Sequence, residues 1–190
     1  MEDDREGEEE GERLTWRDRL DALVGAPMGR GGPSVGPDPV NQPMIRHWAA
    51  AFDDANPVYT DPAAAAASRF GGIVAPPLML QTWTMPTPVL AGIAERGGSP
   101  LPVEGPGPLS VLDEAGFPGT LATDSEFEVL RYLGLGEEVS AETVIEAISE
   151  EKSTRLGAGH SVTWVTTYRD GDGDPVGRQR FRILKFRPRS

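Results

Sequence analysis

The chain has 190 residues, enough for one domain with an ordinary core, and carries a formal net charge of −12. It contains no cysteine, which excludes disulfides, thiolate metal sites and a cysteine nucleophile. The acidity argues against nucleic-acid binding, which needs a basic face, and no apolar run approaches the ~20 residues of a membrane span. We therefore expect a soluble protein of the cytoplasm.

The N-terminal segment is expected to lie outside the compact domain. Residues 1–12, MEDDREGEEEGE, contain eight acids and one arginine, so we expect a disordered acidic arm. Leu14, Leu20 and Leu23 follow at helical spacing and predict a short helix, and the Gly- and Pro-rich residues 26–39 predict a linker. The chain thus divides into an N-terminal segment, 1–39, and a compact domain, 40–190.

Short helices are expected in the first part of that domain. Asn41 is placed to cap, and Pro43 to begin, a helix that runs to about Asp54. Its predicted buried stripe is Met44, Trp48 and Phe52. The stretch DPAAAAASRF predicts a second short helix that ends at the Gly71-Gly72 pair.

An apolar segment and a long loop follow. IVAPPLMLQTWTM, residues 73–85, is apolar nearly all round and predicts a helix surrounded by protein, entered through Pro76-Pro77 and cut short at Pro86. Residues 95–119 are too rich in Gly and Pro for a regular element, and a loop of that length is more often functional than accidental.

The last third of the chain predicts antiparallel strands. Four segments rich in Val, Thr, Ile and aromatics cover residues 120–133, 137–149, 157–170 and 175–186. RDGDGDP, between the last two, predicts a hairpin in which Gly171 and Gly173 take positive φ. Helices followed by a strand meander predict an α+β fold.

One motif carries chemistry. Asp54-Ala55-Asn56-Pro57-Val58-Tyr59 resembles the Asp-x-Asn-Pro-x-His signature of the MaoC-like (R)-specific enoyl-CoA hydratases, and the resemblance continues through TDPAAAAASRFGGIVAPP. It implies a single hot dog domain, an antiparallel sheet wrapped around a central helix that is shortened here. In that family, aspartate and histidine add water to an enoyl thioester, and an N–H in a His-Gly step binds the thioester oxygen.

The motif departs from the family pattern at two positions. Tyr59 stands where the family has histidine, and a phenol with a pKa of about 10 is a poor base. Pro77 stands in the His-Gly step, and proline has no N–H. We therefore expect no catalytic residue in this chain. The alternative is that Asp54, Asn56 and Asp61 are turn and cap residues between helices.

A narrower resemblance covers nearly the whole domain. DPVNQPMIRHW, NPVYTD, GIVAPPLMLQTWTM, LDEAGFPGTLATDSE, RYLGLGEEVS and FRILKF are similar to the large, non-catalytic MaoC-like subunits of actinobacterial hydratases that degrade the cholesterol side chain. The resemblance implies a smaller MaoC-like partner that supplies aspartate and histidine in a two-plus-two heterotetramer. It also implies a steroid enoyl-CoA substrate, of which coenzyme A is a part, and no separate cofactor.

Two further expectations come from the same resemblance. A central helix that stops at Pro86 would leave room for a rigid ring system, or the prolines simply end a core helix. Family members continue into a C-terminal module that docks a thiolase-like aldolase, and this chain stops after RILKFRPRS, about where that module begins.

The expected substrate contacts are Tyr59, Phe70, Gly71, Gly72, Ile73, Val74, Ala75, Trp83, Lys152 and Arg155. Trp83 is also a plausible core residue, and for Lys152 and Arg155 a solvated strand end is slightly favoured over contact with CoA phosphates.

The remaining charged and histidine residues are less specific. Arg178, Arg180 and Arg182 share one face of a strand and would meet an acidic partner or CoA phosphates, or protect an exposed face. His47 is expected to face solvent or an interface, and neither it nor His160 has a metal-ligand partner at usable spacing, so no metal site is predicted.

Three functions stay open. The first is the pocket-forming subunit of a heteromeric enoyl-CoA hydratase. The second is a hot dog thioesterase, which needs an acid near the central helix, whereas residues 73–94 contain none. The third is a scaffold that links a hydratase and an aldolase without binding an acyl ligand.

Overall fold

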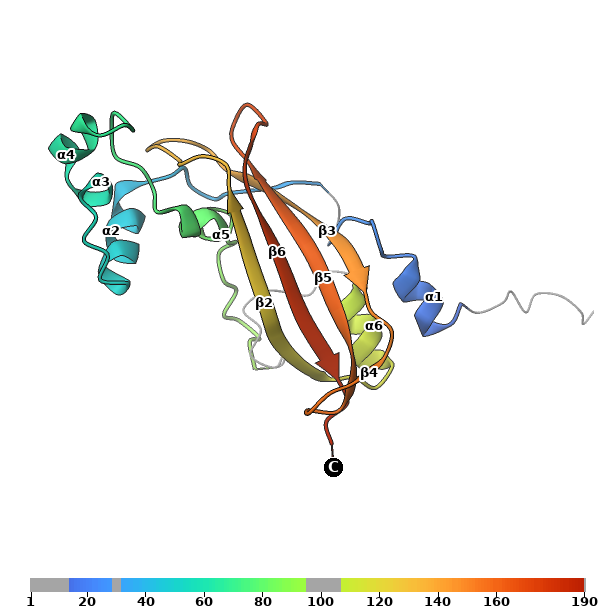
Figure 1. The fold of residues 1–190 in the computed structure, drawn as a ribbon. Coiled ribbons are helices and arrows are strands. Elements are labelled where there is room, and N and C mark those ends of the chain that lie inside the picture. Colours follow the sequence, from blue (N-terminus) through green and yellow to red (C-terminus); the bar gives the residue numbers. More distant parts are fainter. Residues whose placement is uncertain (1–13, 29–31, 95–106, 190) are drawn as a thin grey trace, which may run out of the picture.

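The computed structural model describes residues 14–28, 32–94 and 107–189, and its described part is dominated by one antiparallel sheet (Figure 1). The sheet has six strands in the order β1-β3-β5-β6-β2, with β4 paired to β5. The strands are β1 (Ser34–Val35), β2 (Gly119–Val129), β3 (Ser140–Ile148), β4 (Lys152–Ser153), β5 (Ala158–Arg169) and β6 (Pro175–Phe186). The predicted α+β fold is confirmed. The predicted strand meander was wrong in part, because β2 pairs with β6 at the far side of the sheet and not with β3, the next long strand in the chain.

The β5–β6 hairpin forms where the turn residues predict it. Gly173 has a φ of 88°, whereas Gly171 is not in the left-handed region. The expectation for Gly171 was wrong because the side chain of Asp170 organises the turn: its Oδ1 accepts hydrogen bonds from the N–H groups of Asp172 (3.2 Å) and Asp174 (2.9 Å).

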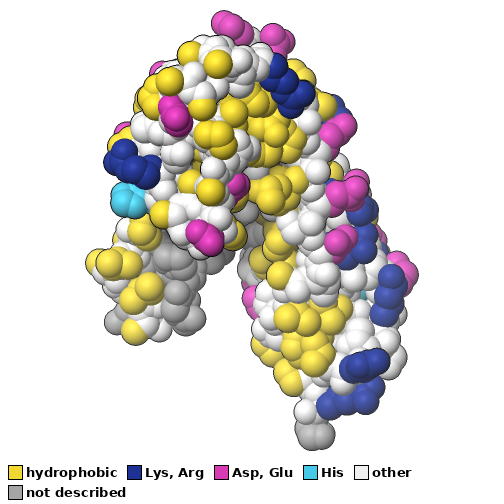
Figure 2. Space-filling model, turned by 60° about the vertical axis from the view of Figure 1, so that its left-hand side comes forward, with side chains coloured by type: hydrophobic (Ala, Val, Ile, Leu, Met, Phe, Trp, Pro, Cys, Tyr) yellow, Lys and Arg dark blue, Asp and Glu magenta, His cyan; other side chains and the backbone are white. Residues whose placement is uncertain are grey.

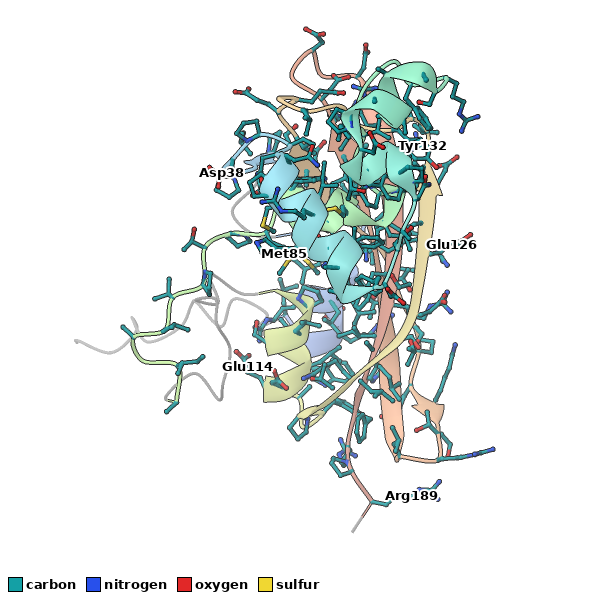
Figure 3. All side chains as sticks on the ribbon, turned by 90° about the vertical axis from the view of Figure 1, so that its left-hand side faces the viewer. Asp38, Met85, Glu114, Glu126, Tyr132 and Arg189 are labelled. Carbon is teal, nitrogen blue, oxygen red and sulfur yellow. The ribbon has the colours of Figure 1, made fainter. Side chains whose placement is uncertain are left out.

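All the described α-helices lie on one side of the sheet, and the opposite side is charged and open to solvent (Figures 1 and 3). The helices are α1 (Trp16–Asp21), α2 (Gln42–Ala51), α3 (Pro57–Thr60), α4 (Pro62–Ala67), α5 (Leu80–Trp83) and α6 (Pro108–Glu114), with the 3-10 turn η1 (Pro77–Met79) leading into α5. The sheet side that carries the helices is called the inner face below. The central helix predicted from residues 73–85 is confirmed as a short element, Pro77–Trp83, that covers only part of the inner face.

Two separate hydrophobic clusters cover the inner face. The first, the α5 core, contains fourteen buried residues. They are Val40, Ile45, Tyr59, Ala65, Ile73, Val74, Ala75, Met79, Leu80, Trp83, Leu133, Val139, Tyr168 and Val176. The second, the α6 core, consists of Leu20, Val111, Leu112, Phe117, Ile145, Ile148, Val162 and Ile183. A long central helix would join these cores; here they remain apart.

Helix α2 begins as predicted but buries a different face. Asn41 Oδ1 accepts a hydrogen bond from the N–H of Met44 (3.1 Å), so Asn41 is the cap. Ile45 and Ala49 are the buried residues, while Met44 is 42% and Phe52 67% exposed. Trp48 is partly buried against the α5 core, so the predicted stripe was wrong for Met44 and Phe52 only. Both faces of the helix carry apolar residues at a spacing of four, and the position of the sheet selects between them.

Described residues before Val40 are part of the folded unit. Helix α1 forms as predicted, and its Leu20 is fully buried in the α6 core. Two described parts of the expected linker are instead bound along the edge of β3: Met28 N–H donates to the carbonyl of Thr143 (2.8 Å), and β1 pairs with Ser140 and Ala141. The acidic arm, residues 1–12, lies outside the described residues.

The long loop predicted at 95–119 contains a regular element. Residues 107–119 form α6 and the start of β2, and Val111 and Leu112 bury themselves in the α6 core. The prediction was wrong there because Gly and Pro stand at the ends of this helix, where Gly107 is the N-cap and Pro108 the first residue. Residues 95–106 lie outside the described part.

Candidate functional site

The polar side chains of the degenerate motif are turn and cap residues. Asp54 Oδ1 accepts a hydrogen bond from the N–H of Asn56 (3.1 Å), and Asn56 Oδ1 accepts one from Val58 (3.3 Å) at the start of α3. Asp61 Oδ1 accepts from the first two free N–H groups of α4, at 2.9 and 3.2 Å. The local-structure alternative for these three residues is confirmed.

Tyr59 is held in the α5 core and is a poor base. Its side chain is only 5% exposed. Burial raises the pKa of the Tyr59 phenol above its usual value of about 10, and the nearby Tyr132 and Asp54 raise it further. The phenol therefore stays protonated at neutral pH, and the position that is a histidine in the family signature offers no proton acceptor.

The start of the central helix offers no N–H where the family has one. Pro77 is the first residue of η1, and Pro76, which precedes it, is buried. Neither residue has an amide hydrogen, so this turn cannot bind a thioester oxygen through the main chain at the His-Gly positions.

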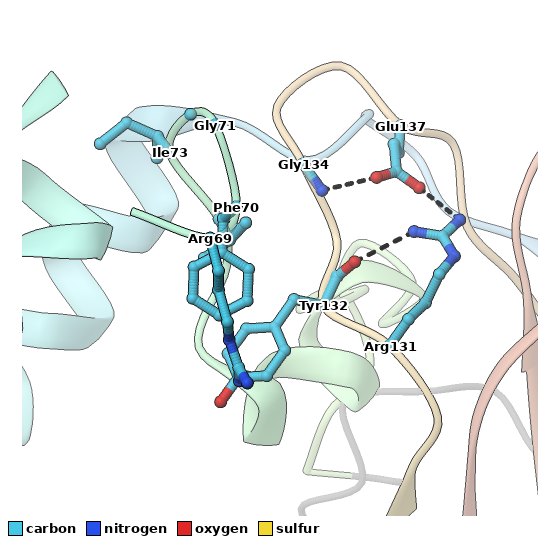
Figure 4. Close-up of a pocket in the computed structure, with 10 residues that line it drawn as sticks. Arg69, Phe70, Gly71, Ile73, Arg131, Tyr132, Gly134 and Glu137 are labelled. Carbon is cyan, nitrogen blue, oxygen red and sulfur yellow. Dashed lines mark hydrogen bonds and ion pairs between the residues drawn. The ribbon is translucent and has the colours of Figure 1, made fainter. Parts of the chain in front are cut away.

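An open pocket of about 590 Å³ lies beside the motif (Figure 4). One wall is the segment from Arg69 to Val74, and the other is the connection between β2 and β3. The rings of Phe70 and Tyr132 pack with centroids 4.6 Å apart, and the Arg69 guanidinium lies 4.8 Å from the Phe70 ring centre. The pocket thus combines an aromatic pair with an exposed cation.

The second wall is fixed by a charge cluster around Arg131. Its Nη2 lies 2.6 Å from carboxylate oxygens of both Glu137 and Asp170, and its Nη1 donates to the carbonyl of Tyr132 (3.0 Å). The other oxygen of Glu137 accepts the N–H of Gly134 (2.6 Å). The hydrogen bond from Arg131 holds the pKa of Asp170 below its usual range. The charged groups of this cluster are paired with one another and hold the wall in place. The carboxylates of Glu137 and Asp170 are therefore not free to act as a base.

The structure brings together some of the predicted substrate contacts and separates others. Phe70, Gly71, Gly72, Ile73 and Val74 line the pocket, and Tyr59 and Ala75 are buried in the core beside it. Trp83 is buried in the α5 core, and its Nε1 has no hydrogen-bond partner within the described part of the chain.

Lys152 and Arg155 do not approach this pocket. Both are exposed, and Lys152 pairs with Gly159 at the start of β5, whereas the α5 core meets that strand at Tyr168. Nine residues of strand separate the two points, roughly 30 Å at 3.3 Å per residue. Figure 1 shows β4 at the opposite end of the sheet from α3 and α4.

Sequence reasoning missed the residues of the second wall, which are Arg131, Tyr132, Gly134 and Glu137. Their contact with the motif segment depends on an isolated bridge between Val74 and Gly134 and on a hydrogen bond from Ala75 N–H to the carbonyl of Leu133 (2.8 Å). Neither pairing leaves a periodic signal in the sequence.

A second candidate surface is the inner face between the two cores, called the inter-core floor below. Its side chains lie opposite one another across β2, β6 and β5: Ser125, Phe181 and Trp164 in one row, and Phe127, Gln179 and Thr166 in the next. Phe127 packs into neither core, and Figure 2 shows the molecule hollowed below α5, between the sheet and the segment that follows this helix.

The remaining charged and histidine residues do not form a site. Arg178 pairs with Glu128 (3.5 Å) and Arg180 with Glu146 (2.7 Å) on the solvent-exposed side of the sheet. His47 is exposed, and His160 is buried beside Trp16 and Phe117 in the other half of the sheet. Among the described residues no group of three His, Cys, Asp or Glu side chains is placed to hold a metal ion.

An antiparallel sheet wrapped around a central helix defines the hot dog class of proteins, and in this chain that helix is short. A model of the "FAS1-like, dehydratase domain region" family matches residues 22–179. The chain belongs to this family, and the resemblance to MaoC-like hot dog proteins is confirmed.

Named relatives agree with this assignment. The chain is 43% identical over 179 residues to a probable enoyl-CoA hydratase alpha subunit of Thermomonospora curvata, covering 90% of this chain and 52% of that protein. It is 41% identical over 156 residues to the 3-oxo-4,17-pregnadiene-20-carboxyl-CoA hydratase alpha subunit of Mycobacterium tuberculosis, covering 82% and 48%. The chain thus spans about half the length of these curated relatives.

Solved structures give the same picture. A chain in the ChsH1-ChsH2 complex of Mycobacterium tuberculosis superposes with a TM-score of 0.76 at 37% identity, over 92% of this chain and 93% of that chain. The (R)-hydratase of A. caviae superposes with a TM-score of 0.52 at 17% identity, over 82% and 95%, and therefore supports the fold alone. None of the helices within the described ranges is long and apolar enough to cross a membrane.

Proposed function

We propose that this chain is the non-catalytic, pocket-forming subunit of a heteromeric enoyl-CoA hydratase that acts on a steroid side-chain acyl-CoA. The observation that carries the proposal is Tyr59, a buried phenol with a raised pKa at the position of the family's catalytic histidine. The prolines at the start of η1 remove the oxyanion donor independently. The site therefore lacks both a base and an oxyanion donor, and these two defects favour a chain that depends on a partner subunit for the hydration step.

The partner we propose is a small MaoC-like subunit with an intact aspartate and histidine, in a two-plus-two assembly. Support comes from the alpha-subunit names of the relatives and from the ChsH1-ChsH2 complex.

The two edges of the sheet differ in how far they are covered by other parts of the chain. The β3 edge is covered by β1 and by residues 25–28, whereas β2, among the described strands, pairs only with β6. Its free edge of eleven residues suits the addition of a partner strand.

The division of work follows from the chemistry. In hydration, a base takes a proton from water as its oxygen bonds to the β-carbon of the enoyl thioester, and a proton is delivered to the α-carbon. We propose that the partner's aspartate and histidine carry out these proton transfers. This chain contributes the inter-core floor, whose hollow below α5 has room for a rigid ring system that a full-length central helix would displace.

The test is reconstitution. The chain is purified alone, and with a MaoC-like chain that has an intact Asp-x-Asn-Pro-x-His motif, and each sample is assayed for loss of the enoyl thioester of a pregnadiene-type steroid-CoA. We expect activity from the complex and none from this chain alone. Activity of the isolated chain would refute the non-catalytic role, and an inactive complex would refute the hydratase assignment.

Two substitutions sharpen the assignment of roles. Tyr59→Phe removes the phenolic oxygen and should leave kcat of the complex within about twofold of the original, because the proposed proton transfers occur in the partner. Replacement of the histidine in the partner motif should abolish turnover. A large loss of kcat in Tyr59→Phe with the complex still assembled would place this residue in the chemistry.

A further inference from the structure

The inter-core floor carries a connected set of hydrogen bonds at its centre, beside the Thr166 hydroxyl, which bonds separately to the Thr143 hydroxyl (2.8 Å). Gln179, only 5% exposed, lies on β6 between the two cores. Its Oε1 accepts a hydrogen bond from the Tyr168 hydroxyl (3.0 Å), and its Nε2 donates to Ser125 Oγ (3.1 Å). A longer contact joins Nε2 to Gln81 Oε1 on α5 (3.5 Å). Buried polar groups of this kind fix direction as well as position.

The chain of donors runs in one direction, from Tyr168 towards Ser125. Burial raises the pKa of Tyr168 to about 12, so its hydroxyl keeps its hydrogen and donates it to the amide oxygen of Gln179. The amide nitrogen must then face Ser125, whose oxygen acts as the acceptor. Within the described residues the hydrogen of the Ser125 hydroxyl has no acceptor of its own, and this serine is exposed.

The surroundings of Ser125 are those of a binding surface. It lies directly opposite Phe181, whose ring packs against Trp164 with centroids 5.1 Å apart, and Phe127 follows two positions along β2. All four side chains face the helix side of the sheet, below α5, where the molecule is hollowed (Figure 2). A single oriented donor beside three partly buried aromatic rings suits a ligand that is apolar except for one acceptor oxygen.

We infer that Ser125, positioned by Gln179, donates a hydrogen bond to a carbonyl oxygen on the ring system of the acyl group and so selects keto-substituted substrates. This inference rests on the proposed function, since it requires the acyl group to occupy the inter-core floor. Ser125 is a specificity residue and Gln179 a positioning residue; neither takes part in the proton transfers. A ring that has a methylene instead of the ketone would leave the donor unpaired and bind more weakly.

The test compares two enoyl-CoA esters with the same ring skeleton, one with a ring ketone and one with a methylene at that position. Both are assayed with the reconstituted complex, and the readout is the ratio of kcat/KM for the two esters. We expect the original complex to prefer the keto ester, and Ser125→Ala to lower that preference roughly tenfold, the effect of one hydrogen bond. The loss should appear for the keto ester alone, because the other ester makes no such bond.

Three further variants separate recognition from structure. Ser125→Thr keeps the hydroxyl and should retain the preference, whereas Gln179→Leu releases Ser125 and should lower it. Thr123→Val is the matched control: its hydroxyl lies on the same strand but donates to the carbonyl of Arg182 (3.1 Å), and its loss should leave the ratio unchanged. Because the ratio cancels the amount of folded enzyme, partial instability of a variant does not obscure the result.

The outcomes distinguish this inference from the function on which it rests. Equal turnover of both esters by the original complex, or an unchanged ratio in Ser125→Ala, would overturn the inference and leave the hydratase subunit intact. Turnover of neither ester by the original complex would overturn the proposed function, and the inference with it.

Discussion

The α5 core and the α6 core cover the same face of one sheet, but they are built from different parts of the chain. The α5 core takes most of its members from residues 40–83, including Tyr59 of the degenerate motif, and the rest from the strands and loops at 133–176. The α6 core has mostly aliphatic members and recruits Leu20 from α1. A central helix that ends at Trp83 leaves part of the inner face uncovered, and α6 and α1 cover a portion of that part. The inter-core floor is the part of the inner face that remains between the two cores.

The largest expected effect comes from a cavity in either core. Leu112→Ala and Met79→Ala each remove a fully buried side chain, one from each core, and should lower the free energy of unfolding by about 2–5 kcal/mol. Chemical denaturation followed by tryptophan fluorescence measures the free energy of unfolding of both variants.

A second pair of substitutions tests whether the two cores are independent. If they are, the costs of the milder substitutions Ile183→Val and Ile45→Val should add to within ~0.5 kcal/mol in the double variant. A larger deviation from additivity would mean that the two cores behave as one.

The α6 core also depends on a buried cation. The Lys185 side chain, only 3% exposed, bonds to Asp113 Oδ1 at 2.5 Å and to Thr120 Oγ1 at 2.9 Å. Asp113→Ala leaves the ammonium buried without its counter-charge. Because Asp113 is half exposed, we expect a cost of about 2 kcal/mol in denaturant unfolding, below that of a fully buried pair.

The adjacent acid is the control for this substitution. Glu114 pairs with Arg19 at 3.0 Å on the surface, and Glu114→Ala should cost less than ~1 kcal/mol. Equal costs for the two alanine variants would show that Lys185 reaches solvent in solution.

In the α5 half, a smaller effect tests the role of the motif's polar residues. Asp61→Ala removes the acceptor of two N–H groups at the start of α4 and should cost about 1 kcal/mol, measured as a lower midpoint of denaturation. Asp61→Asn keeps a capping oxygen and should stay within a few tenths of a kcal/mol of the original. If Asp61→Ala instead altered turnover of the complex with no loss of stability, the residue would belong to the site.

The last effect is a titration that changes stability only at high pH. Tyr168 has a folded pKa of about 12, above the ordinary value of about 10. For an acid whose folded pKa is raised, the contribution to stability is complete below pH ~10 and is lost as the pH rises towards 12. Tyr168→Phe should remove this part of the alkaline decline in stability. Absorbance titration of the original chain should show one tyrosine that ionises near pH 12, and its absence would contradict the burial of Tyr168.

The sequence predicts the strands well and the helix packing poorly. Alternating Val, Thr and aromatic residues mark β2, β3, β5 and β6 because each strand pattern is local. The buried face of α2 is not local: Met44 and Ile45 begin two competing apolar stripes, and the sheet decides between them. Helix α6 was missed because its Gly and Pro neighbours are typical of a loop when they are considered without the core that this helix covers.

Some features of the candidate site also follow from the sequence, and others only from the tertiary structure. That this chain has no base and no main-chain donor at the family positions follows from the sequence alone, since the pKa of a phenol and the missing N–H of a proline are properties of residue type. Only the tertiary structure decided that Arg131 fixes one wall of the pocket and that Gln179 aims Ser125 into the space between the cores. These contacts join residues 39 and 54 positions apart, and such pairs meet only after the sheet has formed in its register.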